Sequence, residues 1–362
     1  MIIFPANVMN MPQRLENLKA EMAKDGYDAF LVTNPFNVYY LVGFVGGNLI
    51  LPLDSEPRLI TSELLYDDAV ERVKGCQVLK LRRGERALKT AFNRLQELLS
   101  RRVLYDTLEA PDYLTLTDWL KGVELKDGKE YMWKLRTVKD RDELQNMRRA
   151  AALASSGMQV AYENLKPGIC EYTVAAEAEY VMRKGGSEGT PFKTIVASGP
   201  RSALPHAEAS DRIAQEGDVV VVDLGAAIGG YTSDLTRTFI VGKPSDRQAS
   251  ILRSVQEAQL KALTSLKAGL ACKEAYTLAR KVLEREGLEE GFIHALGHGV
   301  GLEIHEPPRL SLESQEILQE GNVVTVEPGV YMPGYWGFRW EDMVLIVDDG
   351  YEQLTYKFPE QP

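Results

Sequence analysis

Histidines are concentrated in one short segment of this chain. Three of the four, His294, His298 and His305, lie within twelve residues, and the fourth, His206, lies upstream. Imidazoles act as metal ligands or as acid–base groups near neutral pH. Any one of them could fill a purely structural position, but three so close together indicate a functional site.

Two carboxylates lie on a predicted hairpin that covers residues 218–242. A run of valines is followed by a turn and then by a return rich in Thr, Phe, Ile and Val, which predicts two paired strands. If the two-residue turn is Ile228-Gly229, Asp223 lies directly opposite Asp234, with Cβ atoms about 5 Å apart. Carboxylates at that distance repel each other unless they share a proton or a cation. In a different register both would instead be solvated.

An internal repeat places a second pair of carboxylates in equivalent positions. The segment Glu-Gly-Asp-Val-Val-x-Val-Asp, which ends in Asp223, matches Glu-Gly-Asn-Val-Val-x-Val-Glu, which ends in Glu327. Asp234 similarly corresponds to Glu341, because each opens a strand of the same type. We therefore expect two α/β halves related by a pseudo-twofold axis, each giving one carboxylate hairpin to a shared cleft. A chance resemblance between generic amphipathic segments is the alternative.

These side chains form a donor set that is rich in oxygen and poor in nitrogen. Four carboxylates with one or two imidazoles suit Mn²⁺ or another first-row divalent ion better than a closed thiolate zinc site. Two ions bridged by shared carboxylates would lie about 3.5–4 Å apart and hold a hydroxide between them. The ions would offset the carboxylate repulsion and supply a nucleophile at neutral pH. The residue types predict metal-assisted hydrolysis but do not indicate which bond is cut.

The elements that carry these residues belong to the second of two expected domains. With 362 residues the chain is long enough for two. Residues 1–132 alternate short strands and helices, as in a small α/β domain, and contain no histidine. Residues 133–362 begin with a long amphipathic helix and contain the repeat. We expect both domains to be of the mixed α/β (α+β) class.

Composition argues against several other classes of protein. The net charge of −10 argues against a nucleic-acid partner, and no apolar run approaches the ~18 residues that span a bilayer. The N-terminal segment lacks a basic region and is interrupted by Pro5, so we do not expect a signal peptide. The three widely spaced cysteines are expected to be reduced thiols. We expect a cytoplasmic protein that binds neither nucleic acid nor membrane.

Several motifs of the chain resemble those of the pita-bread metallopeptidases, specifically the Xaa-Pro branch with prolidase and aminopeptidase P. The N-terminal motif Asn-Pro-x-Asn-x-Tyr-Tyr-Leu-x-Gly, from Asn34 to Gly43, is similar to the creatinase-like domain of that branch. The resemblance covers nearly the whole chain. It implies a smaller creatinase-like α/β domain at the N-terminus, followed in the sequence by a pita-bread domain. The motifs of the C-terminal domain are Asp223-Leu-Gly, Asp234-Leu-Thr-Arg-Thr, Gly297-His298-Gly-Val-Gly-Leu-Glu-Ile-His305-Glu, Val326-Glu327-Pro-Gly and Arg339-Trp-Glu341-Asp, preceded by a similar segment that ends in His206.

The resemblance implies two divalent metal ions and a set of five ligands. Asp223 would bind one ion, and His298 and Glu327 would bind the other. Asp234 and Glu341 would bridge the pair. Mn²⁺ is the expected metal, with Co²⁺ or Zn²⁺ as alternatives.

The resemblance also implies roles for residues around the metal ions. His206 and His305 would line the cleft and steady the substrate carbonyl and the developing tetrahedral intermediate. Glu327 could also accept a proton from the attacking water. Arg339 could pair with a ligand carboxylate, although an exposed strand charge is the alternative. His294 would either contact the metal ligands from outside the site or have a purely structural packing role.

Arg309 bears on the choice of substrate. It lies where prolidases carry an arginine for the C-terminal carboxylate of a dipeptide, and a guanidinium fork meeting that carboxylate would favour dipeptides. A solvated loop residue is the alternative. The resemblance thus implies a Xaa-Pro dipeptidase, or prolidase, that cleaves small peptides before proline and forms a homodimer.

Other functions on the same fold are alternatives to the dipeptidase. A Xaa-Pro aminopeptidase would act on longer peptides. The large first domain argues against a methionine aminopeptidase. The complete set of five ligands argues against a metal-independent creatinase and against a non-catalytic binding module.

Overall fold

The computed structural model describes residues 11–356, and the chain divides into two units, Met1–Arg136 and Thr137–Pro362. The boundary predicted from the sequence lies after residue 132. Residues 1–10, which carry most of the segment considered for a signal peptide, lie outside the described residues. Within the described part, no helix has the length and apolar character needed to cross a membrane.

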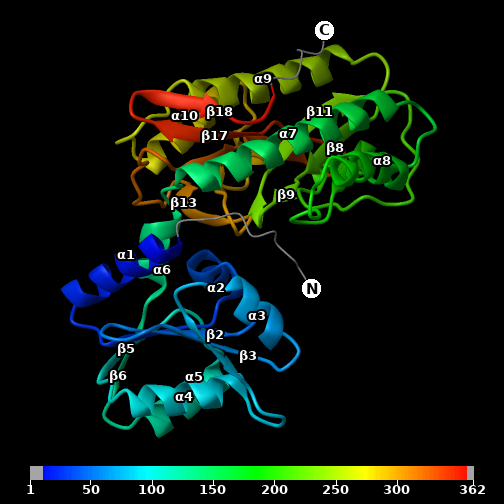
Figure 1. Ribbon diagram of the computed structural model, residues 1–362. Helices are drawn as coiled ribbons and strands as arrows, with labels where there is room; N and C mark the ends of the chain where they lie inside the picture. Colours follow the sequence, from blue (N-terminus) through cyan, green and yellow to red (C-terminus); the bar gives the residue numbers. More distant parts are fainter. Residues whose placement is uncertain (1–10, 357–362) are drawn as a thin grey trace. The chain divides into compact units, whose positions relative to one another are not determined.

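The first unit is built on a six-stranded mixed sheet with the order β4-β3-β2-β1-β5-β6 (Figure 1). Helix α2 begins directly after Asn34, whose side chain accepts hydrogen bonds from two backbone amides of the first turn. The following Pro35 suits the first helical position because its missing N–H is not needed there. The strands are β1 (Ala29–Val32), β2 (Asn48–Pro52), β3 (Arg58–Thr61), β4 (Gln77–Lys80), β5 (Arg102–Tyr105) and β6 (Glu124–Asp127). The helices are α1 (Met11–Lys24), α2 (Pro35–Val42), α3 (Tyr66–Arg72), α4 (Ala87–Glu97), α5 (Ala110–Trp119) and α6 (Lys129–Arg136).

The second unit contains two successive copies of a helix pair followed by strands. In the first copy, α7 (Arg141–Asn164) and α8 (Glu171–Lys184) precede a three-stranded sheet with the order β11-β8-β7. In the second copy, α9 (Asp246–Leu263) and α10 (Cys272–Arg285) precede a five-stranded sheet with the order β13-β12-β14-β17-β18. The strands of the first sheet are β7 (Ile195–Ser198), β8 (Val219–Leu224) and β11 (Leu235–Ile240). Those of the second are β12 (Gly297–Gly299), β13 (Glu306–Leu310), β14 (Val323–Val326), β17 (Asp342–Val347) and β18 (Gly350–Gln353).

Short elements complete the second unit. Two small hairpins are formed by β9 (Ala227–Ile228) with β10 (Tyr231–Thr232) and by β15 (Gly329–Met332) with β16 (Trp336–Arg339), and the 3-10 helices are η1 (Gly199–Ala203) and η2 (Glu289–Gly291).

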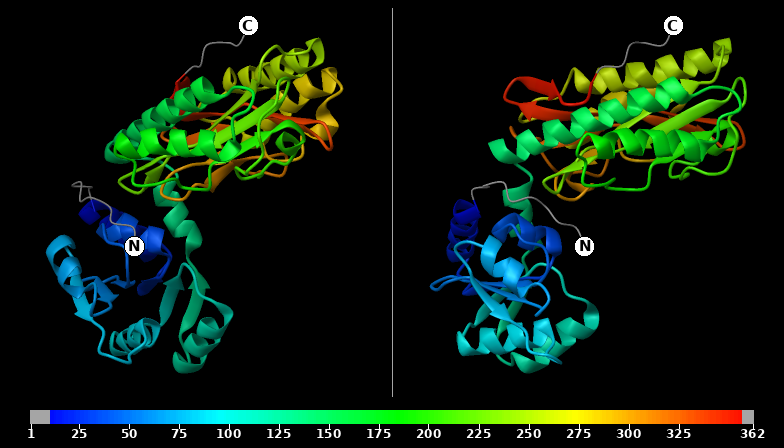
Figure 2. Two further views of the ribbon diagram at one scale, coloured as in Figure 1. Left: turned by 90° about the vertical axis from the view of Figure 1, so that its right-hand side faces the viewer. Right: turned by 45° about the vertical axis from the view of Figure 1, so that its right-hand side comes forward.

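Matching start signals mark the long helices of the two copies. Asp140 and Glu143 form a capping box at the start of α7, and Ser245 and Gln248 form one at the start of α9. Each box satisfies backbone amides that have no partner inside the helix. Figure 2 shows the four helices, coloured green to yellow, beside the strands of both copies.

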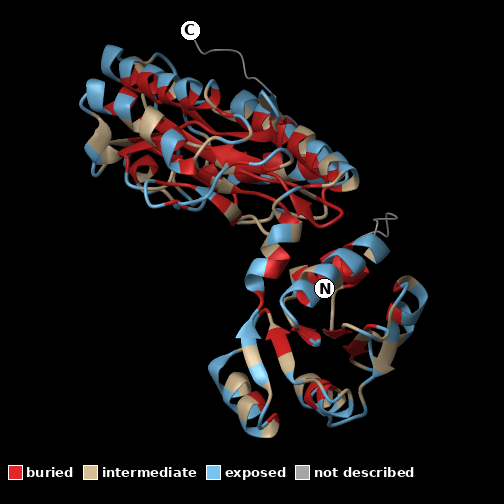
Figure 3. Cartoon of the chain, turned by 90° about the vertical axis from the view of Figure 1, so that its left-hand side faces the viewer, coloured by how far each residue is buried: buried red, intermediate tan, exposed pale blue. Residues whose placement is uncertain are grey.

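The alternation of side chains along the central strands decides which residues face the site. Val220, Val222 and Leu224 of β8 pack in one apolar cluster with residues of α7 and α8. Because neighbouring side chains of a strand point to opposite faces, Asp223 points away from the helices. The same reasoning applies to β14, where Val324 and Val326 join the cluster that includes α9 and α10 and Glu327 follows on the opposite face. Figure 3 shows the central strands of this unit mostly in the colour of buried residues.

The register of the first carboxylate hairpin differs from the prediction by two residues. The turn is Gly229-Gly230, not Ile228-Gly229, and Asp223 lies opposite Thr236. The physical reason is that both turn residues have positive φ, +57° and +78°, which glycine adopts without strain. A shift of two residues keeps every side chain on its expected face.

Polar contacts join the two halves next to Asp234 and Glu341. The amide of Glu341 donates to the carbonyl oxygen of Thr236 at 3.0 Å. On the helix-facing side, the buried Arg237 guanidinium pairs with the buried carboxylate of Asp342 at 2.8 Å. Asp342 also accepts from Gln259 of α9 at 3.0 Å. These bonds fix β11 against β17 where each strand begins beside a carboxylate.

Candidate active site

The repeat brings carboxylates from both halves of the second unit to one pocket. Asp223 lies near the end of β8, and Glu327 directly follows β14. Asp234 and Glu341 directly precede β11 and β17, and His298 lies on β12. The pocket has a volume of about 880 Å³. It is lined by all ten site residues that the sequence analysis singled out: His206, Asp223, Asp234, His294, His298, His305, Arg309, Glu327, Arg339 and Glu341.

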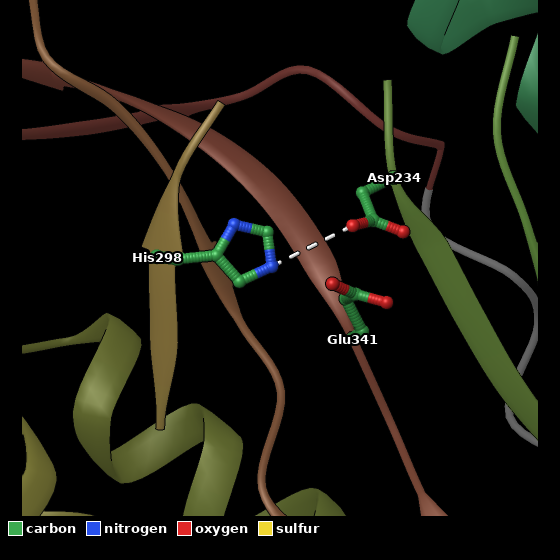
Figure 4. A group of neighbouring side chains, drawn as sticks. All are labelled: Asp234, His298 and Glu341. Atoms are coloured by element: carbon green, nitrogen blue, oxygen red, sulfur yellow. Dashed lines mark ion pairs between the residues drawn. The ribbon is translucent and has the colours of Figure 1, made fainter. Parts of the chain in front are cut away.

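Three of these side chains converge closely enough to share one ion. Ligand atoms of Asp234, His298 and Glu341 all lie within 4.8 Å of one another. Figure 4 shows the three side chains pointing toward a common space. The His298 Nε2 atom is 3.6 Å from Asp234 Oδ2 and 3.3 Å from Glu327 Oε1. The cluster therefore offers nitrogen and oxygen atoms, mostly buried, that suit the binding of a cation.

The protonation state of His298 suits a metal ligand. Its Nδ1 atom lies 3.0 Å from the carbonyl oxygen of Gly299 and donates its proton there, which leaves the Nε2 lone pair toward the carboxylates. Burial and then the neighbouring His305 lower the pKa of His298 to about 4. The backbone amide of His298 is held by Thr325 Oγ1 at 3.1 Å. The ring is therefore neutral and oriented near neutral pH.

Burial and mutual repulsion disfavour the charged forms of the carboxylates around His298. Burial raises the pKa of Glu327 to about 8, and burial with repulsion among the carboxylates raises the pKa values of Asp234 and Glu341 well above their usual range. Asp223 Oδ1 and Glu341 Oε1 are buried without a hydrogen-bond partner among residues 11–356. Such groups in a native protein indicate an ion or water that completes the site. The residues therefore fit divalent metal ions.

One oxygen of each of two carboxylates is already held in place. Glu341 Oε2 accepts from Thr236 Oγ1 at 2.6 Å, and Asp223 Oδ2 accepts from Arg339 Nη2 at 2.6 Å. Such bonds orient a carboxylate and leave its second oxygen to a metal ion.

Arg339 connects several parts of the pocket through its buried guanidinium. Besides Asp223, it donates to Tyr331 Oη at 2.7 Å, to the carbonyl oxygen of Pro205 at 3.1 Å and to Thr236. Tyr331 Oη in turn lies 3.1 Å from Nε2 of His294. Burial lowers the pKa of His294 to about 4, so this ring is a neutral acceptor for the tyrosine hydroxyl.

His206, His305 and Arg309 form the accessible wall of the pocket, since all three are exposed. The His305 ring centroid lies 4.4 Å from that of His298, and partial burial followed by the nearby His206 lowers the pKa of His305. The backbone amide of Arg309 donates to Glu316 Oε2 at 2.8 Å. Among the described residues no carboxylate pairs with the Arg309 guanidinium, so this cation is available to an anionic group in the pocket.

Three residues that support the site were not among those predicted from the sequence. Thr236 holds the side chain of Glu341, Thr325 holds the backbone of His298, and Tyr331 lies between Arg339 and His294. The alternation of strand faces could have indicated both threonines, because each lies two residues from a carboxylate ligand candidate. No local signal distinguishes Tyr331.

Binding of divalent ions is expected to release protons near pH 7. In the metal-free protein the raised pKa of Glu327, about 8, keeps this group largely protonated, and a cation favours the ionised form. The folded, metal-free protein binds the Glu327 proton more tightly than the unfolded chain does. Its free energy of unfolding therefore falls as pH rises from about 4.3, the usual pKa of glutamate, to about 8. The increase in melting temperature caused by Mn²⁺ should therefore be larger at pH 8 than at pH 6.

Calorimetric titration in two buffers of different ionisation enthalpy measures this proton release directly. An equal heat of metal binding in both buffers would contradict the prediction.

Comparisons with known proteins agree with the fold. The family described as "Metallopeptidase family M24" matches residues 145–348, and "Creatinase/Prolidase N-terminal domain" matches residues 14–138. The Xaa-Pro dipeptidase of Pyrococcus furiosus is 38% identical over 350 residues, which cover 95% of this chain and 98% of that protein. The structure of Xaa-Pro dipeptidase from Bacillus anthracis has a TM-score of 0.91 and 34% identity, covering 97% and 99% of the two chains. That of X-Pro aminopeptidase from Thermotoga maritima has a TM-score of 0.88 and 32% identity, covering 95% and 98%.

The fold and these similarities define a hydrolase of the metallopeptidase class. The chain belongs to metallopeptidase family M24 and carries the creatinase-type N-terminal domain of its relatives. It is similar to Xaa-Pro dipeptidases over nearly its whole length. The pita-bread fold, the creatinase-like first domain and the hydrolase class predicted from the sequence are confirmed, and the family implies divalent metal ions.

Proposed function

We propose that the chain is a Xaa-Pro dipeptidase that uses two divalent metal ions, with Mn²⁺ as the first candidate. The observation that carries this proposal is the juxtaposition, in one pocket, of a carboxylate–histidine cluster and the available guanidinium of Arg309. The cluster suits hydrolysis of a peptide bond, and the guanidinium suits the terminal carboxylate of a short substrate.

Five residues would hold the metal ions in this proposal. They are the ligand set expected from the family resemblance, and two of them, Asp223 and Glu341, each have one buried oxygen without a partner among residues 11–356. When bound, the ions supply Lewis acidity and lower the pKa of water to near neutrality. The proposed ligands are Asp223, Asp234, His298, Glu327 and Glu341.

Side chains of the pocket would transfer the proton and stabilise the charge that develops on the substrate. Glu327 would accept the proton of the attacking water and return it to the departing proline nitrogen, which carries no hydrogen in the peptide bond. His206 and His305 lie at the accessible wall, where their N–H groups would donate to the substrate carbonyl oxygen as negative charge develops on it.

Arg309 would set the length of the substrate. A bidentate contact with a free carboxylate requires the residue after the scissile bond to be the last one. A Xaa-Pro aminopeptidase is the second candidate, because the X-Pro aminopeptidase from Thermotoga maritima shares the fold over nearly the whole chain. In that case the exposed Arg309 would be solvated or would contact the backbone of a longer peptide.

The proposal also includes a homodimer, as the family resemblance implies. The molar mass in solution would distinguish a dimer from a monomer of 40.4 kDa.

Alanine release from Ala-Pro and from Ala-Pro-Ala, measured with Mn²⁺ present, tests the substrate assignment. We expect cleavage of the dipeptide with a kcat/KM at least about 10-fold above that for alanine release from the tripeptide. Preference for the tripeptide would favour the aminopeptidase, and cleavage of neither would contradict the Xaa-Pro assignment.

A further inference from the structure

The segment 198–210, here called the His206 loop, carries His206 along the wall of the pocket. It leaves the end of β7, forms η1 and returns toward β7, where Ala209 donates from its amide to the carbonyl oxygen of Thr194. Among the described residues the His206 imidazole has no hydrogen-bond partner, and the side chain is exposed. The position of this ring therefore depends on the backbone of the loop.

A single buried carboxylate holds both ends of the His206 loop. Glu171, the first residue of α8, is 1% exposed and accepts hydrogen bonds from three residues of this loop. Its Oε1 accepts from the amide of Ser198 at 2.7 Å and from the Ser198 hydroxyl at 2.6 Å. Its Oε2 accepts from the amide of Ser210 at 3.0 Å, from the Ser210 hydroxyl at 2.6 Å and from Arg201.

Arg201 extends this arrangement into the middle of the loop. Its Nη1 pairs with Glu171, and its Nη2 donates to the carbonyl oxygen of Glu208 at 2.6 Å. Glu208 lies two residues after His206, so the Glu171–Arg201 pair reaches the backbone beside the imidazole. On the pocket side, Arg339 donates to the carbonyl oxygen of Pro205, directly before His206. The backbone is thus held on both sides of His206, at Pro205 by Arg339 and at Glu208 by Arg201.

We propose that Glu171 is a positioning residue that fixes the His206 loop over the metal centre. This inference rests on the proposed function, in which His206 contacts the substrate carbonyl. Glu171 does not line the pocket, and its side chain bonds to the loop rather than to the proposed metal ligands, so it would act through the loop alone. Its loss should affect the rate of the chemical step rather than metal content.

The substitution Glu171→Gln tests this role without leaving a cavity. Both carboxylate oxygens face donors, so an amide nitrogen on the Oε1 side would oppose the backbone N–H of Ser198, and one on the Oε2 side would oppose the backbone N–H of Ser210 and the Arg201 guanidinium. The serine hydroxyls can accept from the new amide, so they do not oppose it. One end of the loop would lose hydrogen bonds to residue 171, while the volume of that side chain would stay nearly the same. A displacement of about 1 Å in a positioned group can cost about 100-fold in rate.

We expect the kcat of Glu171→Gln on Ala-Pro to fall about 10- to 100-fold, with unchanged metal content and a smaller change in KM. In a His206→Ala background the same substitution should cost less than about 3-fold, because the positioned group is already absent. Additive losses in the double variant would overturn the proposal.

Glu143→Gln provides a matched control. Glu143 is also a buried carboxylate in the first turn of a helix, 2% exposed, but its partners include the amide of Asp140 and the hydroxyl of Tyr231 instead of residues of the His206 loop. We expect this variant to lower thermal stability without a specific loss of kcat. An equal loss of kcat in both variants would indicate a general effect on folding and contradict the proposal.

Hydrogen exchange distinguishes failure of this inference from failure of the proposed function. Glu171→Gln should speed exchange of the backbone amides at 198–210, but not of those in α7, in a protein that still binds its metal. Unchanged exchange in the loop would overturn the inference whatever the substrate is. Failure of the wild-type protein to cleave Ala-Pro would contradict only the proposed function.

Discussion

Replacing Glu341 by Ala is expected to remove bound metal and peptidase activity together. Glu341 is 1% exposed, its Oε2 is fixed by Thr236, and its Oε1 has no protein partner within residues 11–356. It also belongs to the cluster with Asp234 and His298 in which all ligand atoms lie within 4.8 Å. Loss of an outer partner of a metal ligand already costs about 10- to 100-fold in affinity or activity, so loss of Glu341, a proposed bridging ligand, should cost more. We expect at least about a 1,000-fold fall in kcat/KM.

Metal content per chain and kcat/KM on Ala-Pro should be measured on the same preparation of this variant. Glu352→Gln serves as the control, because Glu352 is a half-exposed carboxylate of the same sheet that pairs with Arg148 at 2.8 Å. The control should keep both metal and activity, since exposed ion pairs contribute little to stability. Full activity of Glu341→Ala would show that the bridging assignment is wrong.

Replacing Arg309 by Met is expected to lower kcat/KM for dipeptides selectively. A hydrogen bond to a charged group contributes about 1.5–3 kcal/mol, which corresponds to about 10- to 150-fold in kcat/KM. The loss should appear mainly in KM, because the terminal carboxylate is bound equally in the ground and transition states. Rates on Ala-Pro and Ala-Pro-Ala measured side by side give the selectivity directly.

Arg309→Lys separates charge from geometry. Lysine keeps the positive charge but lacks the planar fork that meets both carboxylate oxygens, so it should recover only part of the dipeptide activity. The tripeptide rate should change less than about 3-fold in both variants. An equal fall for dipeptide and tripeptide would contradict a carboxylate-binding role and assign Arg309 to the structure of its loop, where its amide is bonded to Glu316.

The internal repeat explains why so much of the pocket could be predicted from the sequence. Matching segments end in Asp223 and Glu327, and strand alternation turns both away from the helices. The register of the first hairpin was wrong by two residues, because Gly229-Gly230 forms a turn that Ile228 cannot. A two-residue error leaves Asp223 on its face, so the prediction of a shared pocket did not depend on the exact turn.

Contacts between distant segments account for what the sequence could not indicate. Glu171 lies 27 residues before Ser198 and 39 before Ser210, and no periodic pattern links them. Tyr331 gains its place only when β15 and β16 pair and bring it beside Arg339. Local patterns predict the faces of strands and the starts of helices, whereas such hydrogen bonds follow from the packing of the whole unit.

Titration of the metal-free protein with Mn²⁺, with proline release from Ala-Pro followed at each addition, tests the central claim most directly. We predict negligible activity without metal, an increase as ions bind, and a plateau at two ions per chain. Activity that is equally high in the chelated protein, or bound metal without any proline release, would contradict a metal-dependent Xaa-Pro dipeptidase.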